Sequence, residues 1–111
     1  MSVRVEVWAY ALQRLSAMIM APLVIVHIGV LIYAVQGGLS TAEMLGRTQS
    51  TVLWPVFYGV FFVAAGIHAA IGLRTILKET LSPPRPVLDG VAFVFLVVVC
   101  ILGARAVAAI A

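Results

Sequence analysis

Residues 52–78 read VLWPVFYGVFFVAAGIHAAIGLRTILK, and this stretch decides the fold. Nearly every side chain in it is apolar, and at ~1.5 Å per residue a helix of this length crosses the ~30 Å hydrocarbon core of a bilayer. Two further apolar stretches have spanning length, roughly 12–35 and 87–109. The sequence therefore predicts an all-α integral membrane protein, with three transmembrane helices in one domain over residues 1–111.

The composition excludes a soluble globular domain. Of the 111 residues, 64% are hydrophobic and only 10% are charged, whereas soluble domains carry about 25% charged residues. The net charge of +3 comes from seven Lys and Arg residues, which we interpret as signals of membrane topology and not as a surface for nucleic acid. The single cysteine, Cys100, lies within the third apolar stretch and cannot form a disulfide inside the chain.

Two polar connections separate the three apolar stretches. In the first, the Gly-Gly pair at 37–38 predicts the end of a helix. A capping box from Ser40 to Glu43 then predicts one short helical turn, closed at Gly46. In the second connection, residues 81–86 (LSPPRP) hold three prolines, which predict a stiff segment without helix.

The distribution of cations predicts the orientation in the membrane. One side of the chain carries five cations, Arg4, Arg14, Arg74, Lys78 and Arg85, and the other side carries Arg47 and Arg105. Cytoplasmic loops hold the excess of Lys and Arg. We therefore expect a multi-pass protein of a bacterial-type inner (plasma) membrane, with its N-terminus in the cytoplasm.

His68 lies about two thirds of the way along the second apolar stretch. Hydrocarbon offers a lone imidazole no hydrogen-bond partner, so an ionisable side chain at this depth indicates a functional site. At about 100° per residue, the same helix face carries mostly small residues, which leave a shallow slot for a flat ligand: Ala64, Ala65, Ile71 and Gly72. Arg74 and Lys78 follow where the helix leaves the membrane. A haem matches this pattern, because it needs an axial nitrogen, apolar surroundings and cations near its propionates.

A second imidazole, His27, lies deep in the first apolar stretch, beyond Pro22, where a proline kink is expected. The first two spans run antiparallel, and each histidine lies about four residues past the middle of its own span. The two histidines are therefore ~12 Å apart in depth, too far to ligate one iron through two bonds of about 2 Å each. Each needs a partner from another chain to ligate a haem, or it is a structural residue hydrogen-bonded to a neighbouring helix.

Two motifs resemble the cytochrome b membrane-anchor subunits of succinate dehydrogenase and fumarate reductase. At the start of the first span, Gln13-Arg14-Leu15-Ser16-Ala17 is similar to the Q/H-R-x-S/T-A/G signature of these anchors. In the second span, His68-x-x-x-Gly72-Leu73-Arg74, followed by Glu79, is similar to their H-x-x-x-G-[LIM]-[RWQ] run ending in an acidic residue. Three spans in a chain of 111 residues also fit, so the resemblance covers essentially the whole sequence.

The resemblance implies that the chain forms half of an anchor helix bundle in a four-subunit complex. A flavoprotein oxidises succinate, an iron–sulfur subunit relays electrons, and two anchors bind haem b and reduce quinone near the cytoplasmic face. It also implies roles for single residues: His68 is the ligand of the haem iron, Arg14 and Ser16 line the quinone pocket or contact the propionates, and Gly72 and Arg74 belong to the haem-binding motif.

The resemblance also concerns His27 and the end of the second motif. His27 is similar to the first-helix histidine of the di-haem anchors, which makes it a candidate ligand of a second haem iron. One type of anchor ends the motif with Asp-Tyr, whereas this chain has Glu79 and Thr80, so we expect no tyrosine contact to quinone from here. The sequence leaves open whether the chain carries one haem or two, which anchor it is, and which quinone it uses.

Alternative functions fit parts of the sequence. The chain could be a haem-free structural anchor of the same complex, or a small helical-bundle membrane protein with a hydrogen-bonded structural histidine. Arg14 could be an interfacial anchor, and Ser16 could hydrogen-bond back to its own helix. A small multidrug-type transporter fits poorly, because every carboxylate lies at a span end or in a loop: Glu6, Glu43, Glu79 and Asp89.

Overall fold

A computed structural model describes residues 3–111, and it is built from four helices. They are α1 (Val3–Gln36), α2 (Thr41–Gln49), α3 (Leu53–Thr80) and α4 (Arg85–Ile110). The helices α1, α3 and α4 are each long and apolar enough to cross a membrane. The prediction of an all-α membrane protein with three spans is therefore confirmed, and the chain is a multi-pass membrane protein.

In the first connection the predicted capping box is confirmed, but the short helix is longer than predicted. Helix α1 ends at Gln36, and Gly38 adopts a φ of 62°, which glycine reaches without steric cost. The Ser40 hydroxyl accepts a hydrogen bond from the Glu43 backbone N–H at 3.2 Å, which completes the predicted capping box. The predicted stop at Gly46 is wrong, because α2 continues to Gln49. A glycine inside a helix costs only about 1 kcal/mol and does not have to end it.

The second connection is shorter than predicted. Helix α4 begins at Arg85, so Pro86 lies in its first turn and not in an extended segment. The first backbone N–H groups of a helix have no partner within the helix, and a proline there loses nothing. Only Leu81–Pro84 separate α3 from α4, with Ser82 at a φ of 48°.

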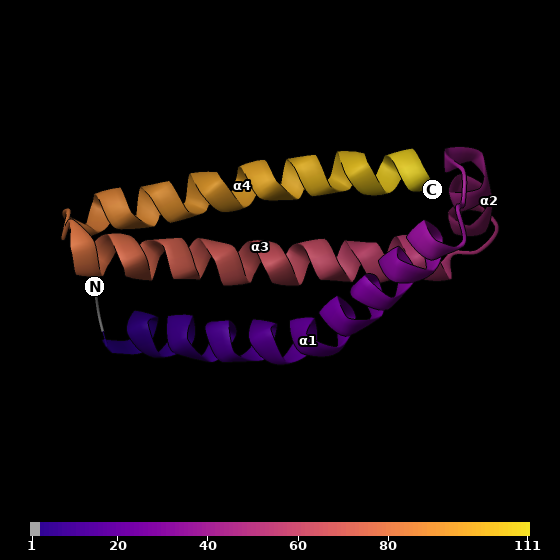
Figure 1. Ribbon diagram of the computed structural model, residues 1–111. Helices are drawn as coiled ribbons and strands as arrows, with labels where there is room; N and C mark the ends of the chain where they lie inside the picture. The colour runs from indigo at the N-terminus through magenta and orange to yellow at the C-terminus, as the bar shows by residue number, and fades with distance from the viewer. Residues whose placement is uncertain (1–2) are drawn as a thin grey trace.

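The three long helices lie side by side with α3 in the middle, so that α1 and α4 both pack against it (Figure 1). The N-terminus and the α3–α4 turn lie at one end, which we call the Arg74 end. Helix α2 and the C-terminus lie at the opposite end, which we call the α2 end. Helix α1 follows α3 closely in its first half and then bends, as expected for the helix that contains Pro22.

Small residues make the contact between α3 and α4. A Cβ built on Gly103 of α4 would lie 2.9 Å from the Phe62 ring, and one on Gly66 of α3 would lie 3.3 Å from Leu96 and Val99. Glycine at these positions lets the helices approach closely, which is how helices associate in lipid. Over residues 3–111 the buried apolar side chains are few: Ala64, Ala70 and Leu88. Most large apolar side chains are exposed, as expected for half of a bundle whose outer faces meet lipid or another chain.

Candidate functional site

Ser16 of α1 lies against His68 of α3. Ser16 is one of the two buried polar residues in the described range, at 4% exposure. Its hydroxyl donates to the Gln13 backbone carbonyl at 3.0 Å and lies 3.5 Å from His68 Nδ1. His68 itself is half-buried. The structure thus joins two predicted site residues that are far apart in the sequence, and it also shows the bond from Ser16 to its own helix that we considered as an alternative.

Gly72 lies where the Gln13 side chain crosses from α1 to α3. A Cβ on Gly72 would be 3.7 Å from Gln13 Nε2, so the amide packs directly over this glycine. Gln13 Oε1 is buried and has no hydrogen-bond partner among the described residues. In the sequence, Gln13 is the first residue of the Gln13–Ala17 motif, and no role was predicted for it. A polar residue on the buried side of a spanning helix was the signal that could have identified it as a site residue.

An apolar groove of about 330 Å³ runs along the same α1–α3 contact. Its lining combines small and aliphatic residues of both helices: Leu12, Leu15, Ser16, Ile19, Gly59, Val60, Val63, Ala64 and Ile67. The predicted slot beside His68 is therefore partly filled by α1. What stays open is this narrower groove, which includes Ala64.

Arg74 is held in a cluster of four charges that joins three helices at the Arg74 end. Its Nε donates to Asp89 Oδ1 of α4 at 2.9 Å, and its Nη2 donates to Glu6 Oε1 of α1 at 3.4 Å. Lys78 Nζ lies 3.7 Å from the other oxygen of Glu6. The Arg74 side chain is only 8% exposed, and the two cations balance the two carboxylates. The predicted contact of Arg74 with a propionate stays a prediction, and in this structure the guanidinium ties the helices together.

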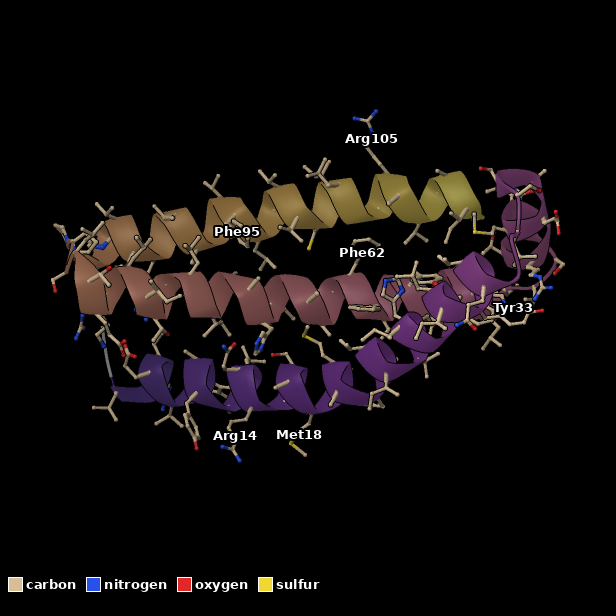
Figure 2. All side chains as sticks on the ribbon, in the orientation of Figure 1. Arg14, Met18, Tyr33, Phe62, Phe95 and Arg105 are labelled. Atoms are coloured by element: carbon tan, nitrogen blue, oxygen red, sulfur yellow. The ribbon has the colours of Figure 1, made fainter. Side chains whose placement is uncertain are left out.

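Arg14 lies on a different face of α1 from Ser16. Its side chain is exposed and points away from the bundle (Figure 2), with Cζ 5.8 Å from the centre of the Tyr10 ring. Within this chain, Arg14 and Ser16 therefore do not line one pocket. A molecule that contacts Arg14 approaches from the outer face of α1, where another chain or lipid would lie.

His27 lies in the other half of the molecule. Its ring packs edge-on against Tyr58 and Phe61 of α3, with ring centres 5.8 and 5.3 Å apart. Its Nδ1 is buried and has no hydrogen-bond partner within residues 3–111. His68 lies seven to ten residues further along α3 than these two aromatic residues, which is about 10–15 Å of helix. The two histidines are thus too far apart in depth to ligate one iron.

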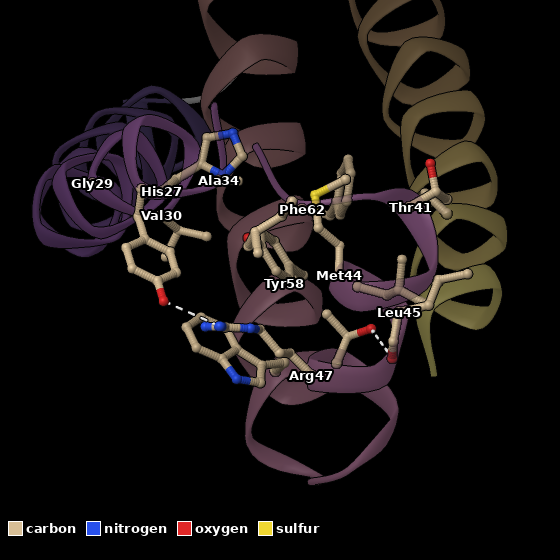
Figure 3. Close-up of a pocket in the computed structure, with 16 residues that line it drawn as sticks. His27, Gly29, Val30, Ala34, Thr41, Met44, Leu45, Arg47, Tyr58 and Phe62 are labelled. Atoms are coloured by element: carbon tan, nitrogen blue, oxygen red, sulfur yellow. Dashed lines mark hydrogen bonds between the residues drawn. The ribbon is translucent and has the colours of Figure 1, made fainter. Parts of the chain in front are cut away.

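His27 also lines a cavity of about 610 Å³ at the α2 end (Figure 3). The cavity lies between the bent half of α1, the helices α3 and α4, and α2 as its floor. Its polar lining includes Tyr58 and the pair formed by Arg47 and Tyr33. In this pair Arg47 Nη2 donates to the tyrosine oxygen at 3.1 Å.

The motifs, the three spans and the Ser16–His68 contact all point to one group of membrane subunits. The family described as succinate dehydrogenase/fumarate reductase transmembrane subunit matches residues 1–104. The chain belongs to this family. No curated protein and no solved structure matches it. As a family member, the chain is a membrane subunit of a succinate dehydrogenase or fumarate reductase complex, whose other subunits are its expected partners.

Proposed function

We propose that this anchor subunit binds haem b through His68 and helps to pass electrons from an iron–sulfur subunit to quinone. The haem would be shared with a second anchor that supplies the opposite axial ligand, because His27 lies too far away in depth to do so. The observation that carries the proposal is the placement of His68: a half-buried imidazole inside a spanning helix, with a hydroxyl on Nδ1, in a chain of this family.

The residues around His68 fit such a ligand. Metal-ligating histidines usually contact a polar group through the nitrogen that does not bind the metal, and Ser16 takes that place here. On α3, the helix face that carries His68 also carries mostly small residues, Ala64, Ala65 and Gly72. When bound, a haem ligated by two imidazoles would carry single electrons and would not activate oxygen.

We further propose that quinone is reduced near the Arg74 end, which the excess of cations assigns to the cytoplasmic side. Arg14 lies on this half of α1 and presents its guanidinium outwards, so it can donate hydrogen bonds to a quinone held between this chain and the second anchor. The flavoprotein and the iron–sulfur subunit would dock at the same end. This placement brings the electron donor and the acceptor to one side of the membrane.

The experiment is a reduced-minus-oxidised spectrum of the purified complex, with and without His68→Ala. We expect the variant to lose most of the haem b signal, because a spanning helix offers no other nitrogen ligand at this depth. Flavin content and succinate oxidation by a soluble dye serve as controls for assembly. Full haem content with an unchanged spectrum in the variant would refute His68 as a ligand and favour the haem-free anchor.

A second haem at His27 is the alternative that the cavity at the α2 end supports. The cavity is large, mostly apolar and lined by His27, whose Nδ1 has no partner among the described residues. The haem-to-flavin ratio of the intact complex distinguishes the cases. A ratio of two to one supports a ligand at His27, and a ratio of one to one restricts haem binding to His68.

A further inference from the structure

The Ser16 hydroxyl contacts both the Gln13 carbonyl and His68 Nδ1. Together the two contacts bear on which ring nitrogen of His68 carries the hydrogen. A serine hydroxyl has one hydrogen to donate and two lone pairs that accept. The hydrogen points to the Gln13 carbonyl at 3.0 Å, and a carbonyl can only accept. His68 Nδ1, 3.5 Å away at the long end of the hydrogen-bonding range, therefore faces a lone pair of Ser16. A hydrogen bond between them requires that Nδ1 carries the hydrogen.

This arrangement selects one form of the imidazole. A neutral histidine with its hydrogen on Nδ1 has its lone pair on Nε2, and only a nitrogen with a free lone pair can bind a metal. We propose that Ser16 is a positioning residue that holds His68 in the form whose Nε2 is available to the haem iron. The inference rests on the proposed function, and it gives Ser16 a role towards the ligand in place of a direct contact with quinone.

The surroundings of Ser16 favour this role. The hydroxyl is buried between α1 and α3, and the Arg74 cluster ties the same two helices together through Glu6, which fixes their register. Arg14, two residues away, is exposed and free to meet a molecule outside the α1–α3 pair. Ser16 also lines the apolar groove of about 330 Å³, so a quinone in that groove is the competing explanation.

The test compares Ser16→Ala and Ser16→Thr in the purified complex. Outer partners of ligating histidines typically change metal affinity by about 10–100-fold, so Ser16→Ala should release haem at least about tenfold faster. The haem midpoint potential should also rise, because an imidazole without this partner is less basic and stabilises ferric iron less. Ser16→Thr keeps the hydroxyl and should stay close to the wild type. The KM for quinone should not change in either variant.

Two further variants complete the design. Thr75 donates to the Ile71 carbonyl of its own helix at 3.0 Å, as Ser16 does to Gln13, but the structure shows no imidazole beside it. Thr75→Val is therefore the matched control, and it should leave the haem unchanged. In Ser16→Cys the side chain is similar in size to serine, but its sulfur accepts hydrogen bonds only weakly. This variant should move haem release and potential in the same direction as Ser16→Ala, also if Ser16→Ala fails to assemble.

The outcomes separate this inference from the proposed function. Haem release and potential at wild-type values in both Ser16→Ala and Ser16→Cys, together with a raised KM for quinone, would overturn the positioning role and assign Ser16 to quinone. If His68→Ala removes haem while the Ser16 variants leave it intact, only this inference fails. If His68→Ala leaves the haem in place, the proposed function fails first.

Discussion

Both histidines lie within membrane-spanning helices, yet their surroundings differ. His68 has a hydroxyl beside Nδ1 and lies where α1 and α3 run together, near the Arg74 cluster. His27 lies between two aromatic edges beside a cavity, and its Nδ1 has no partner in residues 3–111. A metal-binding imidazole needs support on its second nitrogen. The surroundings of a histidine, and not the residue type alone, therefore separate His68, the proposed ligand, from His27, whose Nδ1 has no partner among the described residues.

The two ends of the molecule also differ in how closely their helices are held together. The Arg74 end is closed by ion pairs between three helices, and the α2 end is opened by the bend of α1 into a cavity of about 610 Å³. We therefore expect substitutions at the Arg74 end to have larger effects than those at the α2 end.

The largest effect is expected for Arg74→Gln. The change removes the guanidinium that joins Asp89 and Glu6, and it should destabilise the subunit by about 1–3 kcal/mol. The loss should not be larger, because both carboxylates are partly exposed and regain contact with water. The measurement is the temperature at which the purified complex dissociates. Arg105→Gln is the control, because Arg105 points away from the bundle (Figure 2). Equal destabilisation by both variants would contradict the role of the cluster.

A smaller effect is expected for His27→Leu. His27 is half-buried, and its buried Nδ1 has no hydrogen-bond partner among the described residues. Replacing this ring with an apolar side chain should therefore change stability by less than about 1 kcal/mol, or increase it. With a single haem on His68, the haem-to-flavin ratio stays at one. A wild-type ratio of two that falls to one in His27→Leu would remove the contrast between the histidines, because both would then be ligands.

The smallest effect is expected for Arg47→Gln. Arg47 is exposed, and its bond and cation–π contact with Tyr33, 5.0 Å from the ring centre, contribute about 0.5–1 kcal/mol at most. Tyr33→Phe keeps the ring and loses only the hydrogen bond, so it should cost less still. The dissociation temperature of the purified complex measures both effects. A loss as large as that of Arg74→Gln would show that the α2 end also holds the subunit together.

The sequence predicted the spans well because hydrophobic length is a local property. The predicted end of α2 and the predicted start of α4 were wrong, because Gly46 and Pro86 lie inside these helices without ending them. Whether a glycine or proline ends a helix depends on the hydrogen bonds of its neighbours. Residue type alone does not supply this information.

The candidate site was predictable in part. Helical spacing placed Gly72 on the face of His68, but it could not show that the Gln13 side chain packs over that face. The partners of Arg74 lie on two other helices, so no local sequence pattern predicts them. The separation of Arg14 from Ser16 was implicit in the sequence, because residues two apart on a helix do not face each other. The resemblance grouped them by motif, and the structure separates them by face.

The bend that accompanies Pro22 has a consequence for how such chains can diversify. Pro22 removes one backbone hydrogen bond of α1, so the half that carries Ser16 and the half that carries His27 meet at a bend. We expect a mutation that tilts the second half to change the angle of this bend and not to shift Ser16 along α3. We expect evolution to vary the α2 end freely, exchanging what fills its cavity, while the arrangement around His68 is inherited intact.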